Sequence, residues 1–210
     1  KLSRYDASMI ASEYGLDFPI DGGSPSSENI RLAQAIAASL SDTDLPESLP
    51  KIGAALWRND AGALEALAES LGKATEFKLE ASLDAGTELR AKLKHYSGAM
   101  FYYEGEWYWG IDRLHYLEER LVSLGASRAP TEQFVAPCPN VSVEGVSDAS
   151  TLTLEFFPSL RSPYTSIVFD ETVALAERIG INFVMRPVLP MVMRGVPATR
   201  EKGMYIFSDT

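Results

Sequence analysis

The chain of 210 residues contains a single cysteine, Cys138, and only two histidines, His95 and His115. One cysteine cannot form an internal disulfide or a dithiol pair, which excludes Cys-x-x-Cys redox chemistry within the chain. Because the histidines are far apart in the sequence pattern, we expect no metal site, and no Ser-His-Asp triad can be inferred. Cys138 lies between Pro137 and Pro139 without a basic neighbour that would favour a thiolate, so we expect it to be unreactive.

Positive charge is also scarce. The chain has 19 Lys and Arg residues but 29 Asp and Glu residues, which gives a formal net charge of −10 at pH 7. Binding to nucleic acid or to an anionic membrane requires clustered Lys and Arg, so the composition argues against both kinds of partner. No apolar run approaches the length that spans a bilayer, and no signal peptide is visible. We therefore expect a cytoplasmic protein.

Apolar residues make up 46% of the chain, and in the first part they recur at helical spacing. This pattern predicts an all-helical block of roughly ninety residues. Its expected helices are 1–15, closed by Gly15; one capped by Ser26 or Ser27 and extending to Leu40; one following Pro46 and extending to Trp57; one capped by Asp60 and extending to Leu71; and two more over 74–80 and 82–94.

A change of period marks the end of this block. Residues 99–103 and 106–109 are rich in aromatics and flank Glu104-Gly105, which predicts a β-hairpin. We expect the aromatic side chains to form sheet core rather than a platform for a ligand. Asp112 follows the hairpin and is expected to cap a helix that extends to Leu124.

Residues 126–149 have little periodicity and are rich in Pro and Ser, which predicts a linker.

A strand is expected over 152–157, and a second strand over 181–188. Between them, Ser162-Pro163 predicts the start of a helix, with Ser162 as N-cap and Pro163 at the first helical position. The positive end of a helix dipole favours an anion or a thiolate at this place. A further helix is expected to start at about Arg200.

The turn Ser162-Pro163-Tyr164 after a buried strand resembles the active-site turn of the DsbA-like thioredoxin superfamily. It is most similar to the branch that contains kappa-class glutathione transferases and 2-hydroxychromene-2-carboxylate isomerases, in which Ser-Pro-Tyr replaces the Cys-Pro-His-Cys of the oxidoreductases. Three other stretches also resemble motifs of that branch: Gly110-Ile111-Asp112-Arg113-Leu114, Arg186-Pro187-Val188-Leu189 and Lys202-Gly203-Met204-Tyr205.

The order of these parts is circularly permuted relative to the family. The resemblance implies an α/β, thioredoxin-like fold with a large helical insertion, in which the strand–helix–strand part lies C-terminal to the helical and hairpin part. The expected divisions are 1–125, the linker 126–149, and 150–210, with 150–210 docking on the first part to complete one sheet. Because the chain begins and ends within helical patterns, we expect a fragment of a tandem-domain protein, with a true permutation as the alternative.

The resemblance also implies a chemistry. Glutathione would be the cofactor, and Ser162 the catalytic residue whose hydroxyl stabilises the glutathione thiolate. Lys202 would hold a carboxylate, Asp112 the γ-glutamyl amine, and the backbone of Gly98 and Ala99 the cysteinyl unit. Pro163, Tyr164 and Arg161 would line the pocket of a small aromatic or unsaturated electrophile. The implied reaction is isomerisation or conjugation, and a homodimer or a second tandem domain is a further expected partner.

Simpler interpretations stand beside this one. Ser162 and Asp112 are residues that commonly cap helices, and Lys202 is of a type that is commonly solvated. The family has a cis-proline before the hairpin, whereas this chain has Ser97-Gly98-Ala99-Met100 there. A non-catalytic thioredoxin-like domain with a structural or partner-binding role is therefore the alternative. A DsbA-type disulfide oxidoreductase is nearly excluded because no Cys-x-x-Cys is present.

Overall fold

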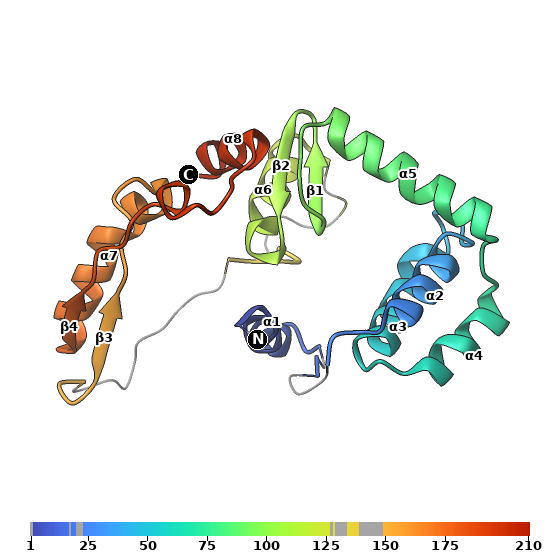
Figure 1. Ribbon diagram of the computed structural model, residues 1–210, viewed down its shortest axis with the longest axis horizontal. Helices are drawn as coiled ribbons and strands as arrows, with labels where there is room; N and C mark the ends of the chain where they lie inside the picture. The colour runs from blue at the N-terminus through green and yellow to red at the C-terminus, as the bar shows by residue number, and fades with distance from the viewer. Residues whose placement is uncertain (1, 17, 20–22, 127, 129–133, 139–148) are drawn as a thin grey trace. The chain divides into compact units, whose positions relative to one another are not determined.

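A computed structural model describes residues 2–16, 18–19, 23–126, 128, 134–138 and 149–210 (Figure 1). The chain divides into two compact units, Lys1–Leu89 and Arg90–Thr210. The hairpin and the strand–helix–strand part therefore share one unit, which differs from the division expected from the sequence. Most of the expected linker 126–149 lies outside the described residues.

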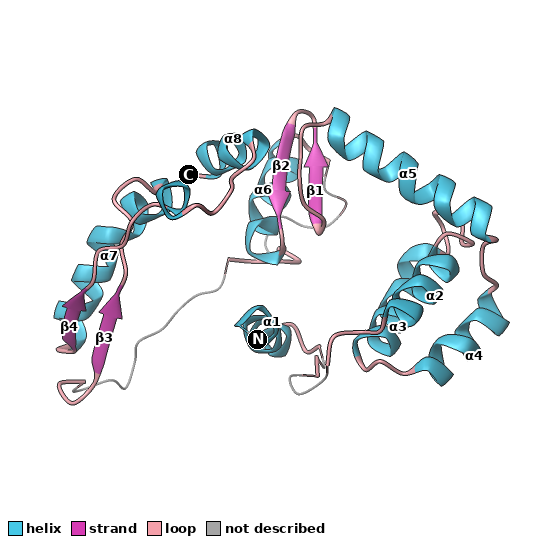
Figure 2. Ribbon diagram, in the orientation of Figure 1, coloured by secondary structure: helices cyan, strands magenta, loops and turns pink. Residues whose placement is uncertain are grey.

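The first unit is helical (Figure 2). It contains α1 (Leu2–Glu13), α2 (Ser27–Ala37), α3 (Leu45–Trp57), α4 (Ala61–Leu71) and most of α5 (Glu76–Lys92). Ser26 caps α2 as expected, since its hydroxyl accepts a hydrogen bond from the Asn29 amide at 3.1 Å. The expectation of two helices over 74–80 and 82–94 is wrong, because α5 continues through this stretch, which contains no proline.

A small apolar core holds α2, α3 and α4 together. Ile36 and Leu64 are fully buried, and Ile52 of α3 packs in the same cluster. These side chains recur at the helical spacing that the sequence shows, so their burial accounts for the arrangement of the three helices. Removing such apolar surface from water is the main favourable term in the folding of this unit.

The cap of α4 gives a direct test of local structure in this unit. The Asp60 carboxylate accepts a hydrogen bond from the Ala63 amide at 2.9 Å. Asp60→Ala removes this cap and is expected to lower the free energy of unfolding by about 1 kcal/mol. Urea denaturation measures the loss. The control is Asp42→Ala at an exposed position outside any helix, where a change below about 0.5 kcal/mol is expected; equal losses in both variants would contradict the capping role.

The second unit begins with the expected hairpin. β1 (Met100–Tyr103) pairs antiparallel with β2 (Glu106–Trp109), with Tyr103 opposite Glu106. Glu104 and Gly105 have φ values of 43° and 92°, which is the left-handed backbone that a two-residue hairpin turn requires. The expectation that the aromatics form sheet core holds only in part. Tyr108 is buried, but Phe101, Tyr102 and Trp109 are exposed.

The helix after the hairpin starts later than expected. A 3₁₀ turn, η1 (Ile111–Arg113), precedes α6 (Leu114–Ser123). Arg113 occupies the N-cap position of α6, so the expectation that Asp112 caps this helix is wrong. Asp112 instead lies within the 3₁₀ turn, and its carboxylate accepts a hydrogen bond from Arg113. The 3₁₀ turn therefore lies between the hairpin and α6 in the chain.

The last part of the chain is a strand–helix–strand unit followed by a helix. β3 (Thr153–Phe156), α7 (Pro163–Ile179) and β4 (Asn182–Met185) follow one another, and β3 pairs parallel with β4. A 3₁₀ turn, η2 (Met191–Arg194), then leads to α8 (Arg200–Asp209). The starts of both α7 and α8 agree with the sequence expectation, because Pro163 and Thr199 mark them.

The protein is therefore a mixed α/β structure in which helices dominate. Within the described ranges the strands form two separate two-stranded sheets, β1–β2 and β3–β4. The single completed sheet that we expected is not formed. No helix in the part of the chain that the structure describes combines the length and the apolar character that crossing a membrane requires.

Candidate functional site

Ser162 stands at the start of α7 with an extended backbone, at φ −87° and ψ 124°. It occupies the N-cap position as expected, but its hydroxyl makes no capping hydrogen bond. Its amide donates to the Ser159 carbonyl at 2.7 Å, and its carbonyl accepts from the Ser166 amide at 3.2 Å. The half-buried hydroxyl is thus held in place by the backbone while remaining available, at the positive end of a 17-residue helix.

A cavity of about 360 Å³ opens in front of Ser162. Three cationic side chains line it, those of Arg161, Arg194 and Lys202, and no carboxylate among the residues that the structure describes does. The remaining lining residues are mostly apolar and come from the start of α7, from η2 and from α8: Pro163, Pro190, Met191, Val192, Ala198, Ile206 and Phe207, with Ser159 and Gly203. We call this the Ser162 pocket. Its charge and the dipole of α7 both favour an anion.

Lys202 lies in the first turn of α8. Thr199 caps this helix, because its hydroxyl accepts a hydrogen bond from the Lys202 amide at 3.2 Å. The lysine is half-buried and lines the same pocket as Ser162, although 40 residues separate the two in sequence. The structure therefore places together the two residues that the resemblance assigned to the sulfur and to a carboxylate of one ligand.

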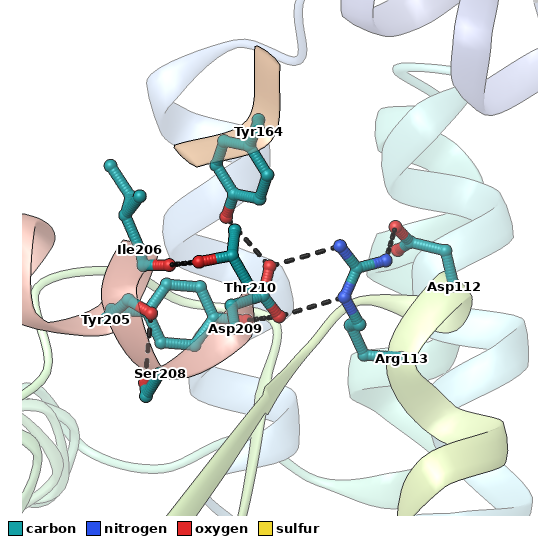
Figure 3. A network of polar contacts seen from close by, with 8 residues as sticks. All are labelled: Asp112, Arg113, Tyr164, Tyr205, Ile206, Ser208, Asp209 and Thr210. Atoms are coloured by element: carbon teal, nitrogen blue, oxygen red, sulfur yellow. Dashed lines mark hydrogen bonds and ion pairs between the residues drawn. The ribbon is translucent and has the colours of Figure 1, made fainter. Parts of the chain in front are cut away.

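A second polar arrangement centres on Asp209, the last residue of α8 (Figure 3). The guanidinium of Arg113 donates two hydrogen bonds to its carboxylate, from Nε to Oδ1 at 2.8 Å and from Nη2 to Oδ2 at 3.0 Å. The hydroxyls of Tyr164 and Tyr205 donate to the same carboxylate at 2.7 and 3.0 Å. Only 8% of the Asp209 side chain is exposed. We call this group the Asp209 cluster.

The electrostatics of the cluster follow from burial and hydrogen bonding. Burial alone raises the pKa of Asp209, but the hydrogen bonds from Arg113, Tyr164 and Tyr205 outweigh it and hold the pKa below its ordinary value. Burial, and then the hydrogen bond to Asp209, raises the pKa of Tyr164 to about 12. Burial likewise raises the pKa of Tyr205. At neutral pH the carboxylate is therefore charged, and both phenols are protonated donors.

A neighbouring cavity of about 280 Å³ borders the cluster. Trp109 and Gly110 of the hairpin line it, with Asp112, Arg113, Tyr164, Tyr205 and Asp209. Asp112 thus lines the same cavity as Tyr164 and does not line the Ser162 pocket. Its side chain is 66% exposed, and its carboxylate accepts a hydrogen bond from Arg113 Nη1 at 3.0 Å.

Gly98 and Ala99 line neither the Ser162 pocket nor the cavity beside the cluster. Ala99 has a positive φ of 55°, and its carbonyl accepts a hydrogen bond from the Gly110 amide at 3.1 Å. That carbonyl therefore closes the base of the hairpin.

The expected site residues therefore fall into three groups. Arg161, Ser162, Pro163 and Lys202 share the Ser162 pocket, Tyr164 and Asp112 share the neighbouring cavity, and Gly98 and Ala99 lie apart. The sequence reasoning missed Arg194, which joins the Ser162 pocket, and Asp209, which organises the cluster. The spacing of Tyr205 and Asp209, four residues apart on a helix, was the only signal of the cluster.

Comparison of the chain with protein-family models, with curated proteins and with solved structures finds no match. The function is accordingly argued from the site itself. Within the described residues, no group of three or more His, Cys, Asp or Glu side chains is arranged to hold a metal ion.

Proposed function

We propose that the Ser162 pocket binds glutathione, and that the protein is a glutathione-dependent isomerase or transferase of the kappa-class and 2-hydroxychromene-2-carboxylate isomerase type. One observation carries the proposal. The Ser162 hydroxyl makes no capping bond and shares a cavity with three cationic side chains and, among the described residues, no carboxylate. Glutathione carries two carboxylates and one thiol, and a pocket of this charge suits such an anion.

The chemistry starts with the thiol. The Ser162 hydroxyl donates a hydrogen bond to the glutathione sulfur, and the N-terminus of α7 adds its partial positive charge. Both stabilise the thiolate, so the thiol releases its proton to solvent. The thiolate then adds to an electrophilic carbon of the unsaturated second substrate, forming a C–S bond while the C=C π bond breaks and its electron pair moves onto the conjugated carbonyl oxygen as an enolate. In an isomerisation the enolate expels the thiolate after bond rotation, which restores the double bond; in a transfer the enolate takes a proton from solvent and the conjugate is released.

The lining residues divide between the two substrates. Lys202, Arg161 and Arg194 supply the charges for the two carboxylates of glutathione. Pro163, with the apolar residues of η2 and α8, forms a wall suited to an aromatic or unsaturated electrophile. Tyr164 contributes its hydroxyl to the Asp209 cluster and does not line the Ser162 pocket, so it takes no part in holding the electrophile. Asp112 remains the predicted partner of the γ-glutamyl amine, at the neighbouring cavity.

A non-catalytic thioredoxin-like domain remains the second candidate. The observation that favours it is the position of Gly98 and Ala99, which line neither cavity and so offer no backbone to the cysteinyl unit of glutathione. In that case the Ser162 pocket has a structural or partner-binding role. The cytoplasm stays the expected compartment for either function.

Binding of glutathione separates the two candidates. At a glutathione concentration of about 100 times Kd, the ligand is expected to stabilise the protein by roughly 3 kcal/mol, which appears as a rise of several degrees in Tm. S-methylglutathione carries the same carboxylates without a thiol and is expected to stabilise less. Isothermal titration calorimetry confirms the stoichiometry. A thermal transition that glutathione at millimolar concentration leaves unchanged would contradict the enzymatic proposal and favour the second candidate.

A further inference from the structure

The geometry points to Asp209 as a positioning residue that sets the relation between Ser162 and Lys202, acting through the hydroxyl of Tyr164. This inference rests on the proposed function of the Ser162 pocket. Asp209 itself does not line that pocket, and nothing in the sequence resemblance assigned it a role.

Tyr164 links the start of α7 to Asp209. Tyr164 is the second residue of this helix and follows Ser162 by two positions. Its hydroxyl donates to Asp209 Oδ2 at 2.7 Å. Because the hydroxyl of Ser162 makes no capping bond, the first turn of α7 lacks the usual side-chain anchor at its N-cap. The Tyr164–Asp209 bond therefore supplies an anchor from outside the helix.

Helix α8 carries both Lys202 and Asp209. The two residues are seven positions apart, or about two helical turns, on a helix whose backbone fixes their separation. Among the described side chains, the Tyr164–Asp209 hydrogen bond is the one that joins α7 to α8. A rotation of one helix against the other would separate the serine hydroxyl from the lysine ammonium, and this bond opposes it.

Arg113 makes the Tyr164–Asp209 anchor rigid. Arg113 holds both carboxylate oxygens of Asp209, at 2.8 and 3.0 Å, and a two-point contact of this kind fixes the plane of the carboxylate. Tyr205 also donates to Asp209, but Tyr205 belongs to α8 itself, four residues away. Its hydroxyl adds to the stability of the cluster without linking the two helices.

This difference between the tyrosines gives a matched test. Tyr164→Phe and Tyr205→Phe each remove one hydroxyl that donates to the same carboxylate, and both are compared with the wild type in the full chain. We expect Tyr164→Phe to weaken glutathione binding about tenfold and Tyr205→Phe to change it by less than about twofold, although the two variants lose similar stability. Calorimetric titration and urea denaturation measure the two quantities.

A second readout needs no ligand. Hydrogen exchange at the Ser166 amide, which donates to the Ser162 carbonyl, is expected to be roughly tenfold faster in Tyr164→Phe than in Tyr205→Phe. Equal exchange in the two variants overturns the inference. Faster exchange in Tyr164→Phe, together with a wild type that does not bind glutathione, supports the anchor and contradicts the proposed function instead. Binding by the wild type with equal affinities in both variants overturns the positioning role alone.

Discussion

Arg113→Met is expected to lower the free energy of unfolding by about 3 kcal/mol, because it leaves the buried Asp209 carboxylate without its cationic partner. The side chain of Asp209 is 8% exposed and that of Arg113 is 27% exposed, so water cannot readily replace the lost guanidinium. Tyr164 and Tyr205 still donate to the carboxylate in the variant, but neither supplies a positive charge. Urea denaturation at neutral pH measures the effect.

Two further variants identify the cause. Asp112 also pairs with Arg113, but its side chain is 66% exposed, and Asp112→Asn is expected to cost less than about 1 kcal/mol. The double variant Arg113→Met with Asp209→Asn removes the buried charge as well, and it is expected to be more stable than Arg113→Met alone. A loss in Asp112→Asn as large as in Arg113→Met would mean that the exposed pair, rather than the buried one, provides the stability.

The pH dependence follows from the lowered pKa of Asp209. In the folded wild type this pKa is below its unfolded value, so the cluster stabilises the fold above the ordinary pKa and loses that contribution as the pH falls through the folded pKa. In Arg113→Met, burial and the hydrogen bonds from both tyrosines remain while those from Arg113 are gone, so the folded pKa of Asp209 rises relative to the wild type. The stability deficit of the variant is therefore expected to shrink as the pH falls from neutral toward the ordinary pKa of an aspartate, about 3.9. A deficit that stays constant over this range would show that Asp209 is not the group responsible.

The local structure of this chain could be predicted well from its sequence, because short-range signals decide it. The Ser162-Pro163 pair marks the start of α7, and Glu104-Gly105 marks the hairpin turn. The failures also have local causes. Helix α6 starts at Leu114, later than predicted, because a 3₁₀ turn that contains Asp112 precedes it. Nothing in the composition of that turn distinguishes it from a first helical turn.

The candidate site could be predicted only in part. Ser162 and Lys202 both lie at helix starts that clear N-terminal signals mark, and the resemblance indicated both residues, which line one pocket in the structure. The Asp209 cluster could not be derived in this way. Arg113 and Asp209 are 96 residues apart, and an ion pair over such a distance depends on tertiary packing that no periodicity records. The pairing of the strands into two sheets depends on tertiary packing in the same way.

Ser162→Ala is expected to abolish most of the activity that we propose while leaving the affinity for the thiol form of glutathione, measured below the pKa of the bound thiol, nearly unchanged. In the proposed site the hydroxyl would act on the sulfur, whereas the three cations that line the pocket would hold the carboxylates. Loss of one preorganised donor to a developing or resident anion typically lowers turnover by about 100-fold. We therefore expect the pKa of the bound glutathione thiol to rise toward that of a free thiol, which the ultraviolet absorbance of the thiolate reports as a function of pH.

Two comparisons make this test specific. Ser166→Ala removes a hydroxyl one turn further along α7, where the side chain is exposed and does not line the pocket, and it is expected to change neither quantity. Lys202→Met is expected to have the opposite signature, weakening the affinity about tenfold while the thiol pKa of the bound glutathione changes little. A general loss of structure would change both the affinity and the thiol pKa in every variant. A change of the thiol pKa in Ser162→Ala and of the affinity in Lys202→Met is therefore expected only if separate groups of the pocket bind the sulfur and the carboxylates. If Ser162→Ala left the thiol titration of bound glutathione as it is in the wild type, the hydroxyl would have no part in the chemistry.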